Sequence, residues 1–88
     1  MDVSVIIVNY HTSELVTDCL RSLNAQCRGV ESEVIVVDNA SEPGLQRKFD
    51  ALFPELEVKC LQLDENVGFG RANNAGAEIA SGRNLFFL

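Results

Sequence analysis

VIVVDNAS, residues 34–41, gives the clearest indication of the fold. The four β-branched residues Val34–Val37 are typical of a short strand buried on both faces of a parallel sheet. Asp38 follows them directly, so its backbone is expected at the carboxyl end of that strand. The run VSVIIV at Val3–Val8 has the same character and predicts a second buried strand. The two runs together favour an α/β fold built on a parallel sheet.

A helix is expected between these two strands. Thr12, Ser13 and Glu14 indicate its start, because they offer a capping hydroxyl and an acid in the first turn. One broad apolar stripe is predicted along it, formed by Leu15, Val16, Cys19, Leu20, Leu23 and Cys27. An apolar stripe of this kind would pack the helix against one face of the sheet.

Two prolines frame the next helix. Pro43 suits the first helical position, and Pro54 ends whatever precedes it. Between them one helical face is predicted to carry Leu45, Phe49, Leu52 and Phe53. This second helix completes a strand–helix–strand–helix pattern.

The rest of the chain continues the alternation. Leu56–Leu63 is predicted as a third strand whose lower apolar density suits an edge or half-covered position. Phe69–Ser81 is typical of an Ala-rich helix ending at Gly82, and Asn84–Leu88 begins a fourth strand. The order βαβαβαβ predicts a three-layer α/β/α, Rossmann-like domain over residues 1–88, with an open, mainly parallel and incomplete sheet.

Composition excludes several classes of protein. The 88 residues are 47% apolar and 23% charged, as in a soluble globular domain. Lys and Arg number 7 against 13 Asp and Glu, and the net charge of −6 argues against nucleic acid and anionic lipid as partners. No apolar run approaches the roughly 20 residues of a membrane span, and the start of the chain does not resemble a signal peptide.

The three cysteines, Cys19, Cys27 and Cys60, are expected to be small buried residues. Their number is odd, their spacing is wide and no CxxC occurs, so neither a disulfide framework nor a zinc site is predicted. A reducing cytoplasmic location fits this pattern.

Polar residues follow each predicted strand, where open parallel sheets bind ligands. Asp38 could accept hydrogen bonds from ribose hydroxyls or a base N–H, or it could close a local turn with Asn39 and Ser41. Tyr10 offers a face for a nucleobase, or it packs at the domain rim. The lone His11 is expected to face solvent.

The third loop carries glycines in the pattern GFGRAN, residues 68–73. It follows the third strand rather than the first, so neither a dinucleotide fingerprint nor a Walker A loop is present. Arg71 could meet a phosphate or a base carbonyl, or simply be solvated. Asn73 and Asn74 form helices weakly, and a buried hydrogen-bonding role or a ligand would explain them. The pair Asp64-Glu65 is expected to be a solvated loop rather than a metal site.

Three stretches together resemble the start of family 2 glycosyltransferases, which have the GT-A fold. They are VSVIIVNYHTSELVTDCLRSL (residues 3–23), EVIVVDNAS (33–41) and ENVGFGRANNAGAEIASGRNLFFL (65–88). They look most like the branch that contains rhamnosyltransferases and similar cell-surface polysaccharide enzymes. One departure is that Ala72-Asn73-Asn74 stands where many members carry Ala-Arg-Asn.

The resemblance implies a nucleotide site for a nucleoside diphosphate sugar. Base and ribose contacts are implied for Tyr10 and Asp38, with further contacts around Asn66, Gly68 and Asn73. The candidate set from these loops is completed by Asn9, Asn39 and Arg71.

The resemblance also implies an inverting, metal-dependent transfer of the sugar to an acceptor hydroxyl. The DxD-type motif that holds Mg²⁺ or Mn²⁺ is expected just after a strand like Asn84–Leu88, and the general base in the acceptor half. Residues 1–88 would then be the nucleotide-binding half, with no catalytic or metal-binding residue and no activity alone. The complete enzyme is expected in the cytoplasm or at the inner face of the cell membrane.

Two other classes share the fold. A receiver-like regulatory module would need several clustered acids and a late lysine, and no lysine follows Lys59. A dehydrogenase half would need glycines in the first loop. A final expectation concerns association, because the terminal run Leu85–Leu88 would leave an apolar, unpaired edge through which the chain pairs with itself.

Overall fold

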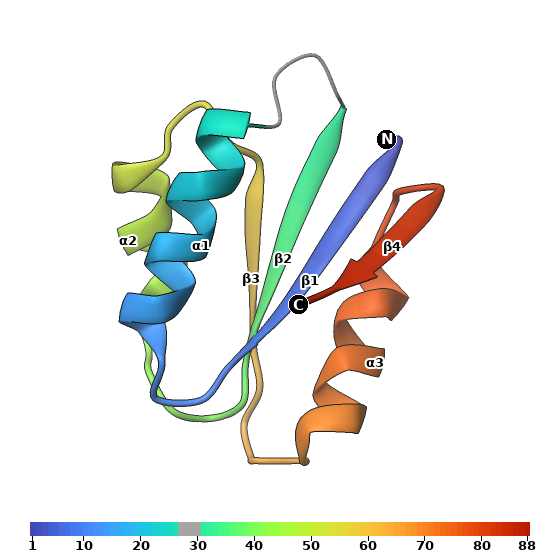
Figure 1. The fold of residues 1–88 in the computed structure, drawn as a ribbon. Helices are drawn as coiled ribbons and strands as arrows, with labels where there is room; N and C mark the ends of the chain where they lie inside the picture. The colour runs from blue at the N-terminus through green and yellow to red at the C-terminus, as the bar shows by residue number, and fades with distance from the viewer. Residues whose placement is uncertain (27–30) are drawn as a thin grey trace.

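The computed structural model describes residues 1–26 and 31–88. Its elements follow the predicted βαβαβαβ order (Figure 1). They are β1 (Val3–Asn9), α1 (Ser13–Gln26), β2 (Ser32–Asp38), α2 (Leu45–Leu52), β3 (Val58–Gln62), α3 (Phe69–Ile79) and β4 (Asn84–Phe87). All strand pairs are parallel and the spatial order is β3-β2-β1-β4, which confirms the predicted sheet and the edge position of the third strand.

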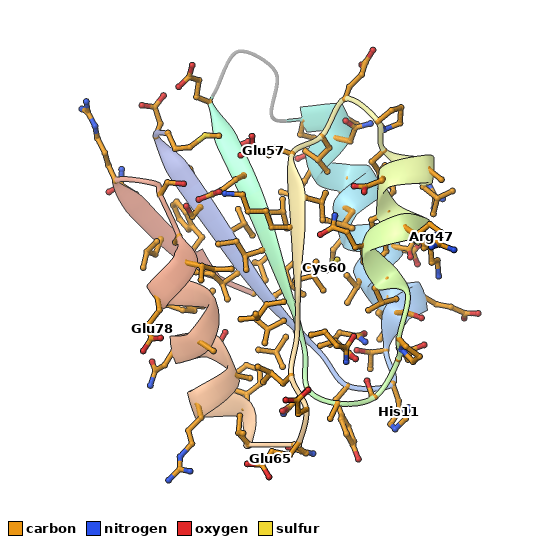
Figure 2. The ribbon with its side chains drawn as sticks, turned by 180° about the vertical axis from the view of Figure 1, so that it is seen from behind. His11, Arg47, Glu57, Cys60, Glu65 and Glu78 are labelled. Atoms are coloured by element: carbon orange, nitrogen blue, oxygen red, sulfur yellow. The ribbon has the colours of Figure 1, made fainter. Side chains whose placement is uncertain are left out.

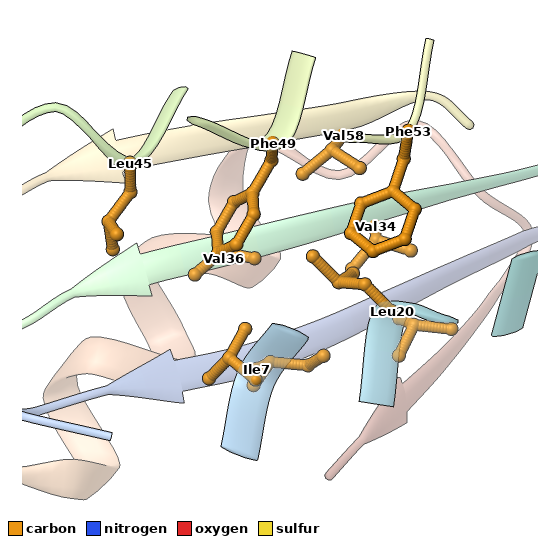
Figure 3. Close-up of a cluster of buried hydrophobic side chains, with 10 residues drawn as sticks. Ile7, Leu20, Val34, Val36, Leu45, Phe49, Phe53 and Val58 are labelled. Atoms are coloured by element: carbon orange, nitrogen blue, oxygen red, sulfur yellow. The ribbon is translucent and has the colours of Figure 1, made fainter. Parts of the chain in front are cut away.

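Helices cover both faces of the sheet, with α1 and α2 on one side and α3 on the other (Figure 1). Successive residues of β2 point to opposite faces, so Val34 and Val36 join the α1–α2 core while Ile35 and Val37 join the α3 core. Figure 3 shows the first core, in which residues of α1 and α2 meet the valines of β2. Burial on both faces explains why this strand is β-branched throughout.

The α3 layer lies close to the sheet because Gly76 has no side chain. A Cβ built at Gly76 would lie 2.8 Å from Cγ2 of Ile6 and 2.9 Å from Cγ2 of Val37. Contacts that short do not occur between real atoms, so a glycine is required where α3 crosses the two central strands.

The predicted apolar stripe of α1 is partly wrong. Leu15 is 65% exposed and Cys19 is exposed, whereas the buried face is formed by Val16, Thr17 and Leu20. Thr17 can be buried because its hydroxyl donates to the carbonyl oxygen of Ser13 at 2.7 Å. A polar residue therefore takes a core-facing position that the apolar pattern assigned to its neighbours.

The expectation that the cysteines are buried also needs correction. Cys19 faces solvent, and Cys60 on β3 is half-buried. Burial, with Asp50 and Asp38 nearby, raises the pKa of the Cys60 thiol to about 12, so it stays protonated and unreactive. Cys27 lies outside the described residues.

The ends of α2 and α3 differ from the prediction. Pro43 is not the first helical residue, because α2 begins at Leu45 after Gly44, whose φ is 83°. Leu52 is exposed rather than part of the buried face. Gly82 is not the helix C-cap, since α3 ends at Ile79. It instead approaches the first strand so closely that a Cβ there would lie 2.5 Å from the Ser4 nitrogen.

A buried carboxylate joins the amino-terminal ends of the strands. Glu33 is fully buried on β2, accepts hydrogen bonds from the hydroxyls of Ser4 (2.6 Å) and Ser81 (2.9 Å), and pairs with Lys59 Nζ at 2.9 Å. Burial alone would raise the pKa of Glu33, but these bonds and the Ser81 N–H outweigh it and lower the pKa to about 2. The network fixes the turn between α3 and β4 to β1, β2 and β3.

Among the described residues, no helix is long and apolar enough to cross a membrane.

Candidate functional site

The three loops predicted to form a site lie together at the carboxyl ends of the strands. The register places Asn9 opposite Asp38 and Asp38 opposite Gln62, so β1, β2 and β3 end side by side. Figure 2 shows His11 and Glu65, from the first and third loops, at the same end of the molecule. The sequence prediction that these loops converge is confirmed.

Asp38 occupies the centre of this end of the sheet and is 1% exposed. One carboxylate oxygen accepts from Asn9 Nδ2 (2.9 Å) and Ser41 Oγ (2.6 Å). The other accepts from the N–H groups of Ser41 (3.1 Å) and Glu42 (2.8 Å) and from Gln62 Nε2 (2.7 Å). The local turn with Ser41, one of the two roles predicted for Asp38, is therefore present, and the carboxylate faces protein donors.

These donors set the charge state of Asp38. Burial raises its pKa, but the hydrogen bonds, led by those from Ser41 and the Glu42 N–H, outweigh burial and lower the pKa to about 2. The carboxylate is therefore ionised at neutral pH. Its hydrogen bonds join the end of β1, the loop after β2 and the end of β3.

Asn9 links the first loop to the second. Its side-chain amide group donates to Asp38 and to Glu42 Oε2, each at 2.9 Å. Its Oδ1 accepts from the N–H (3.2 Å) and hydroxyl (3.1 Å) of Thr12, just before α1. Asn9 is fully buried, so these internal partners use its hydrogen-bonding capacity.

Asn39 and Asn66 join the second loop to the third. Asn39 Nδ2 donates to Asn66 Oδ1 at 2.9 Å, and Asn39 Oδ1 accepts from the N–H of Val67 at 2.9 Å. Asn66 Oδ1 also accepts from the N–H of Gly68, the residue before α3. Asn39 is buried while Asn66 is exposed, so this contact runs from the interior to the surface.

The remaining candidates differ in exposure. Tyr10 is 48% exposed, and its ring meets that of His11 edge-on with centroids 4.6 Å apart. Gly68 and Arg71 are exposed at the start of α3, and Gly68 has a φ of 87° that only glycine adopts easily. These residues are free to meet a ligand at the surface of the three loops.

Asn73 differs from all of these. It lies on the buried side of α3 and is 8% exposed. Within the described part of the chain, its Oδ1 is a buried side-chain atom without a hydrogen-bond partner. A buried acceptor left unpaired is costly, so this atom marks a place where a donor is missing. The two roles predicted for Asn73, a buried hydrogen bond or a ligand contact, stay predictions.

Among the residues that the structure describes, two that are not glycine have left-handed backbone, and both are in these loops. His11 has a φ of 56° and Ala40 a φ of 62°. Such conformations cost about 1–3 kcal/mol and persist where the surroundings impose them. The His11 N–H donates to Ser41 Oγ, and Ser41, the residue after Ala40, donates to Asp38, so hydrogen bonds constrain both positions.

The described residues do not by themselves make a metal centre. Within residues 1–26 and 31–88, no three His, Cys, Asp or Glu side chains come close enough to hold an ion. The carboxylates of Asp38 and Glu42 already accept hydrogen bonds from protein donors. A divalent cation therefore does not fit these side chains.

Sequence reasoning missed Glu42 and Gln62 as members of this constellation. Gln62 could have been found from its place at the end of the third strand. Glu42 could not, because its partner Ser13 is 29 positions away and nothing in the local pattern connects them.

The match to known proteins now identifies the family. Residues 4–88 match the family model described as Glycosyl transferase family 2. The chain belongs to this family. Membership favours the transferase over the receiver-like module and the dehydrogenase half.

Two curated relatives of this glycosyltransferase chain are the uncharacterized glycosyltransferase YwdF of Bacillus subtilis (strain 168) and the succinoglycan biosynthesis protein ExoO of Rhizobium meliloti (strain 1021). Each is 35% identical over 82 residues, or 93% of the chain. The matches cover 30% and 23% of those proteins, so the chain spans less than a third of their length.

Solved structures agree with the fold. S. aureus TarS 1-349 in complex with UDP-GlcNAc superposes with a TM-score of 0.86 at 31% identity, over 100% of this chain and 26% of that one. Mannosyltransferase PcManGT from Pyrobaculum calidifontis, in complex with GDP-Man and Mn²⁺, gives a TM-score of 0.78 at 28% identity, over 90% of this chain and 24% of that one. These neighbours confirm the GT-A-type α/β architecture.

Proposed function

We propose that residues 1–88 are the nucleotide-binding part of a glycosyltransferase domain. The enzyme would transfer a sugar from a nucleoside diphosphate donor to an acceptor hydroxyl in polysaccharide or cell-surface glycan synthesis. The observation that carries this proposal is the set of three interlocked loops at the carboxyl ends of the strands, in a chain of this family. The name of ExoO, a succinoglycan biosynthesis protein, supports the polysaccharide pathway.

The loop residues would divide the work by exposure. Tyr10 would stack on the base, and Arg71 would meet a phosphate or a base carbonyl. Asn66 and Gly68 would contact the nucleotide where the third loop meets α3, and Asn73 would accept a hydrogen bond with its unpartnered oxygen. The buried residues Asn9, Asp38 and Asn39 would hold these groups in place from beneath.

The reaction would be a single displacement with inversion. The acceptor oxygen bonds to the anomeric carbon while the bond from that carbon to the diphosphate oxygen breaks and its electron pair leaves with the diphosphate. The acceptor's proton passes to a general base. The base and the divalent cation would come from parts of the enzyme other than residues 1–88, and binding the nucleotide would be the task of these residues.

The donor is proposed to be a uridine or thymidine diphosphate sugar. TarS is described in complex with UDP and with UDP-GlcNAc, and the loop motifs resemble those of rhamnosyltransferases. Self-association through β4 is also proposed, because this edge strand exposes all four of its residues, among them Phe86 at 56%.

An NMR titration tests nucleotide binding directly. UDP and dTDP are added in turn to the wild-type chain, to Tyr10→Ala and to the control Leu52→Ala, which removes an apolar side chain of similar exposure on α2. Shifts are expected in the three loops, and loss of stacking should weaken binding about 5- to 100-fold in Tyr10→Ala alone. No shift at millimolar nucleotide, or shifts confined to the amino-terminal ends of the strands, would reject the proposal.

A further inference from the structure

Glu42 connects the first and second loops although neither predicted motif contains it. Its Oε2 accepts from Asn9 Nδ2 at 2.9 Å and from the Ser13 N–H at 3.2 Å. Its Oε1 accepts from the Ser13 hydroxyl at 2.8 Å. One side chain of the second loop therefore holds both the last residue of β1 and the first residue of α1.

Between Asn9 and Ser13 lies the turn that carries Tyr10. At its centre, His11 has the left-handed φ of 56°, which an L-residue keeps only where its surroundings impose it. The His11 N–H donates to Ser41 Oγ at 3.0 Å. The consecutive residues Ser41 and Glu42 thus hold the turn at its middle and at both ends.

Packing does not hold this turn on its outer side. A cavity of about 340 Å³ borders it there, and it is lined by His11, Thr12, Ser13, Glu14, Leu15 and Glu42. Tyr10 and His11 are both exposed. The position of the tyrosine ring therefore depends on the hydrogen bonds to Glu42 and Ser41.

We infer that Glu42 is a positioning residue for nucleotide binding, which acts by fixing the Tyr10–His11 turn at the mouth of the site. This inference rests on the proposed function of the loops. Glu42 does not touch the nucleotide. Its effect on nucleotide binding passes through Asn9 and Ser13 to Tyr10.

The direction in which nucleotide affinity changes distinguishes a positioning role of Glu42 from an effect of its charge. Glu42 is an anion near a site for an anionic ligand, so removal of its charge alone would strengthen nucleotide binding. Removal of its hydrogen bonds would release the turn and weaken binding. A glutamine at this position keeps an acceptor oxygen, and its amide group can donate to the Ser13 hydroxyl, so it preserves most of the geometry without the charge.

The experiment measures the Kd of UDP and of dTDP for the wild-type chain, Glu42→Ala, Glu42→Gln and Glu14→Ala. Glu14 lines the same cavity and carries the same charge, but within the described part of the chain it is not a partner of Asn9 or Ser13. Tyr10 is the only tyrosine and there is no tryptophan, so quenching of its fluorescence by acrylamide reports the turn without ligand. Unfolding midpoints are recorded for every variant.

Glu42→Ala should raise the Kd about tenfold or more and make Tyr10 easier to quench. Glu42→Gln and Glu14→Ala should stay within threefold of the wild type. If Glu42→Ala does not fold, Ser13→Ala decides, because it removes one of the three bonds and should change the Kd and the quenching in the same direction by less.

Unchanged or tighter binding by Glu42→Ala, or equal weakening by the alanine and glutamine variants, would overturn the positioning role and leave the proposed function intact. If Glu42→Ala does not fold, an unchanged Kd in Ser13→Ala would overturn it in the same way. A wild-type chain that binds neither UDP nor dTDP would overturn the proposed function and this inference with it.

Discussion

Asp38 shows how one residue type serves two purposes. A carboxylate at the end of a buried strand suits a ribose or base ligand, so the sequence position of Asp38 makes it a candidate for ligand binding. In the structure the same carboxylate accepts five hydrogen bonds from within the protein. We therefore propose that Asp38 contributes to ligand binding through the loops that it holds.

We expect the replacement of Asp38 to lower the stability of the fold first, and to weaken binding only as a consequence. Asp38→Ala leaves the N–H groups of Ser41 and Glu42 without their acceptor, so we expect the free energy of unfolding to fall by about 2–4 kcal/mol. Urea denaturation measures this, with Glu65→Ala as an exposed acidic control that should change it by less than about 0.5 kcal/mol. An Asp38→Ala chain as stable as the control would show that the network contributes little.

Two buried carboxylates make stability depend on pH. The pKa values of Glu33 and Asp38 are lowered to about 2 from ordinary values of 4.5 and 3.8. Because the folded pKa values are depressed, both contributions are fully present above about pH 4.5 and are lost as the pH falls toward 2. Each of the two carboxylates should contribute about 2–3 kcal/mol to the free energy of unfolding at neutral pH.

Urea unfolding between pH 6 and pH 2 tests this dependence. The free energy of unfolding of the wild type should decline below about pH 4.5. That of Glu33→Gln should decline less steeply, because this variant lacks one of the two buried carboxylates. A wild-type curve that stays level down to pH 2.5 would contradict the prediction.

At the scale of elements, the strands were easier to predict than the helix faces. The run Val34–Val37 is β-branched at every position and so fits only a strand with both faces covered. The stripe of α1 was misjudged because Thr17 satisfies its own hydroxyl within the helix and can be buried, which turns Leu15 and Cys19 outward. Apolar spacing alone does not carry that information.

Two glycines of α3 make a matched pair. Gly76→Ala should destabilise the fold by about 1–3 kcal/mol, because the new Cβ would overlap the side chains of Ile6 and Val37. Gly70→Ala lies in the same helix with nothing within 4 Å of the new atom, and should stabilise the fold by about 0.5–1 kcal/mol. Thermal unfolding of both variants gives the comparison, and effects of the same sign would refute the packing argument.

At the scale of the whole molecule, the convergence of loops was predictable and their connections were not. Parallel topology brings Asn9, Asp38 and Gln62 to one edge, and that follows from the strand order alone. The hydrogen bonds from Ser13 to Glu42 and from Asn39 to Asn66 join residues 27 to 29 positions apart, through side chains whose directions depend on the finished fold. Local motifs do not encode such contacts.

The exposed edge strand should make the isolated chain associate. Leu85–Leu88 are all exposed, and β4 pairs with β1 on one side only. Sedimentation should show a dimer or larger species of the wild type at tens of micromolar, on the order of the concentrations at which exposed edges aggregate. A Phe86→Lys, Leu88→Lys double variant should be monomeric, while Leu52→Lys on α2 should behave as the wild type does. A monomeric wild type would reject the association.

The strand order has a consequence for how the polypeptide is made. Of the four strands described, β1 is made first. It pairs on one side with β2 and on the other with β4, where Val3 faces Asn84. The backbone of β1 on that side therefore has no strand partner until the residues between Val3 and Asn84 have been made. Contacts between such distant parts of a sequence slow folding. We expect β1, β2 and β3 to assemble during synthesis, and β4 to join them in a separate, later step.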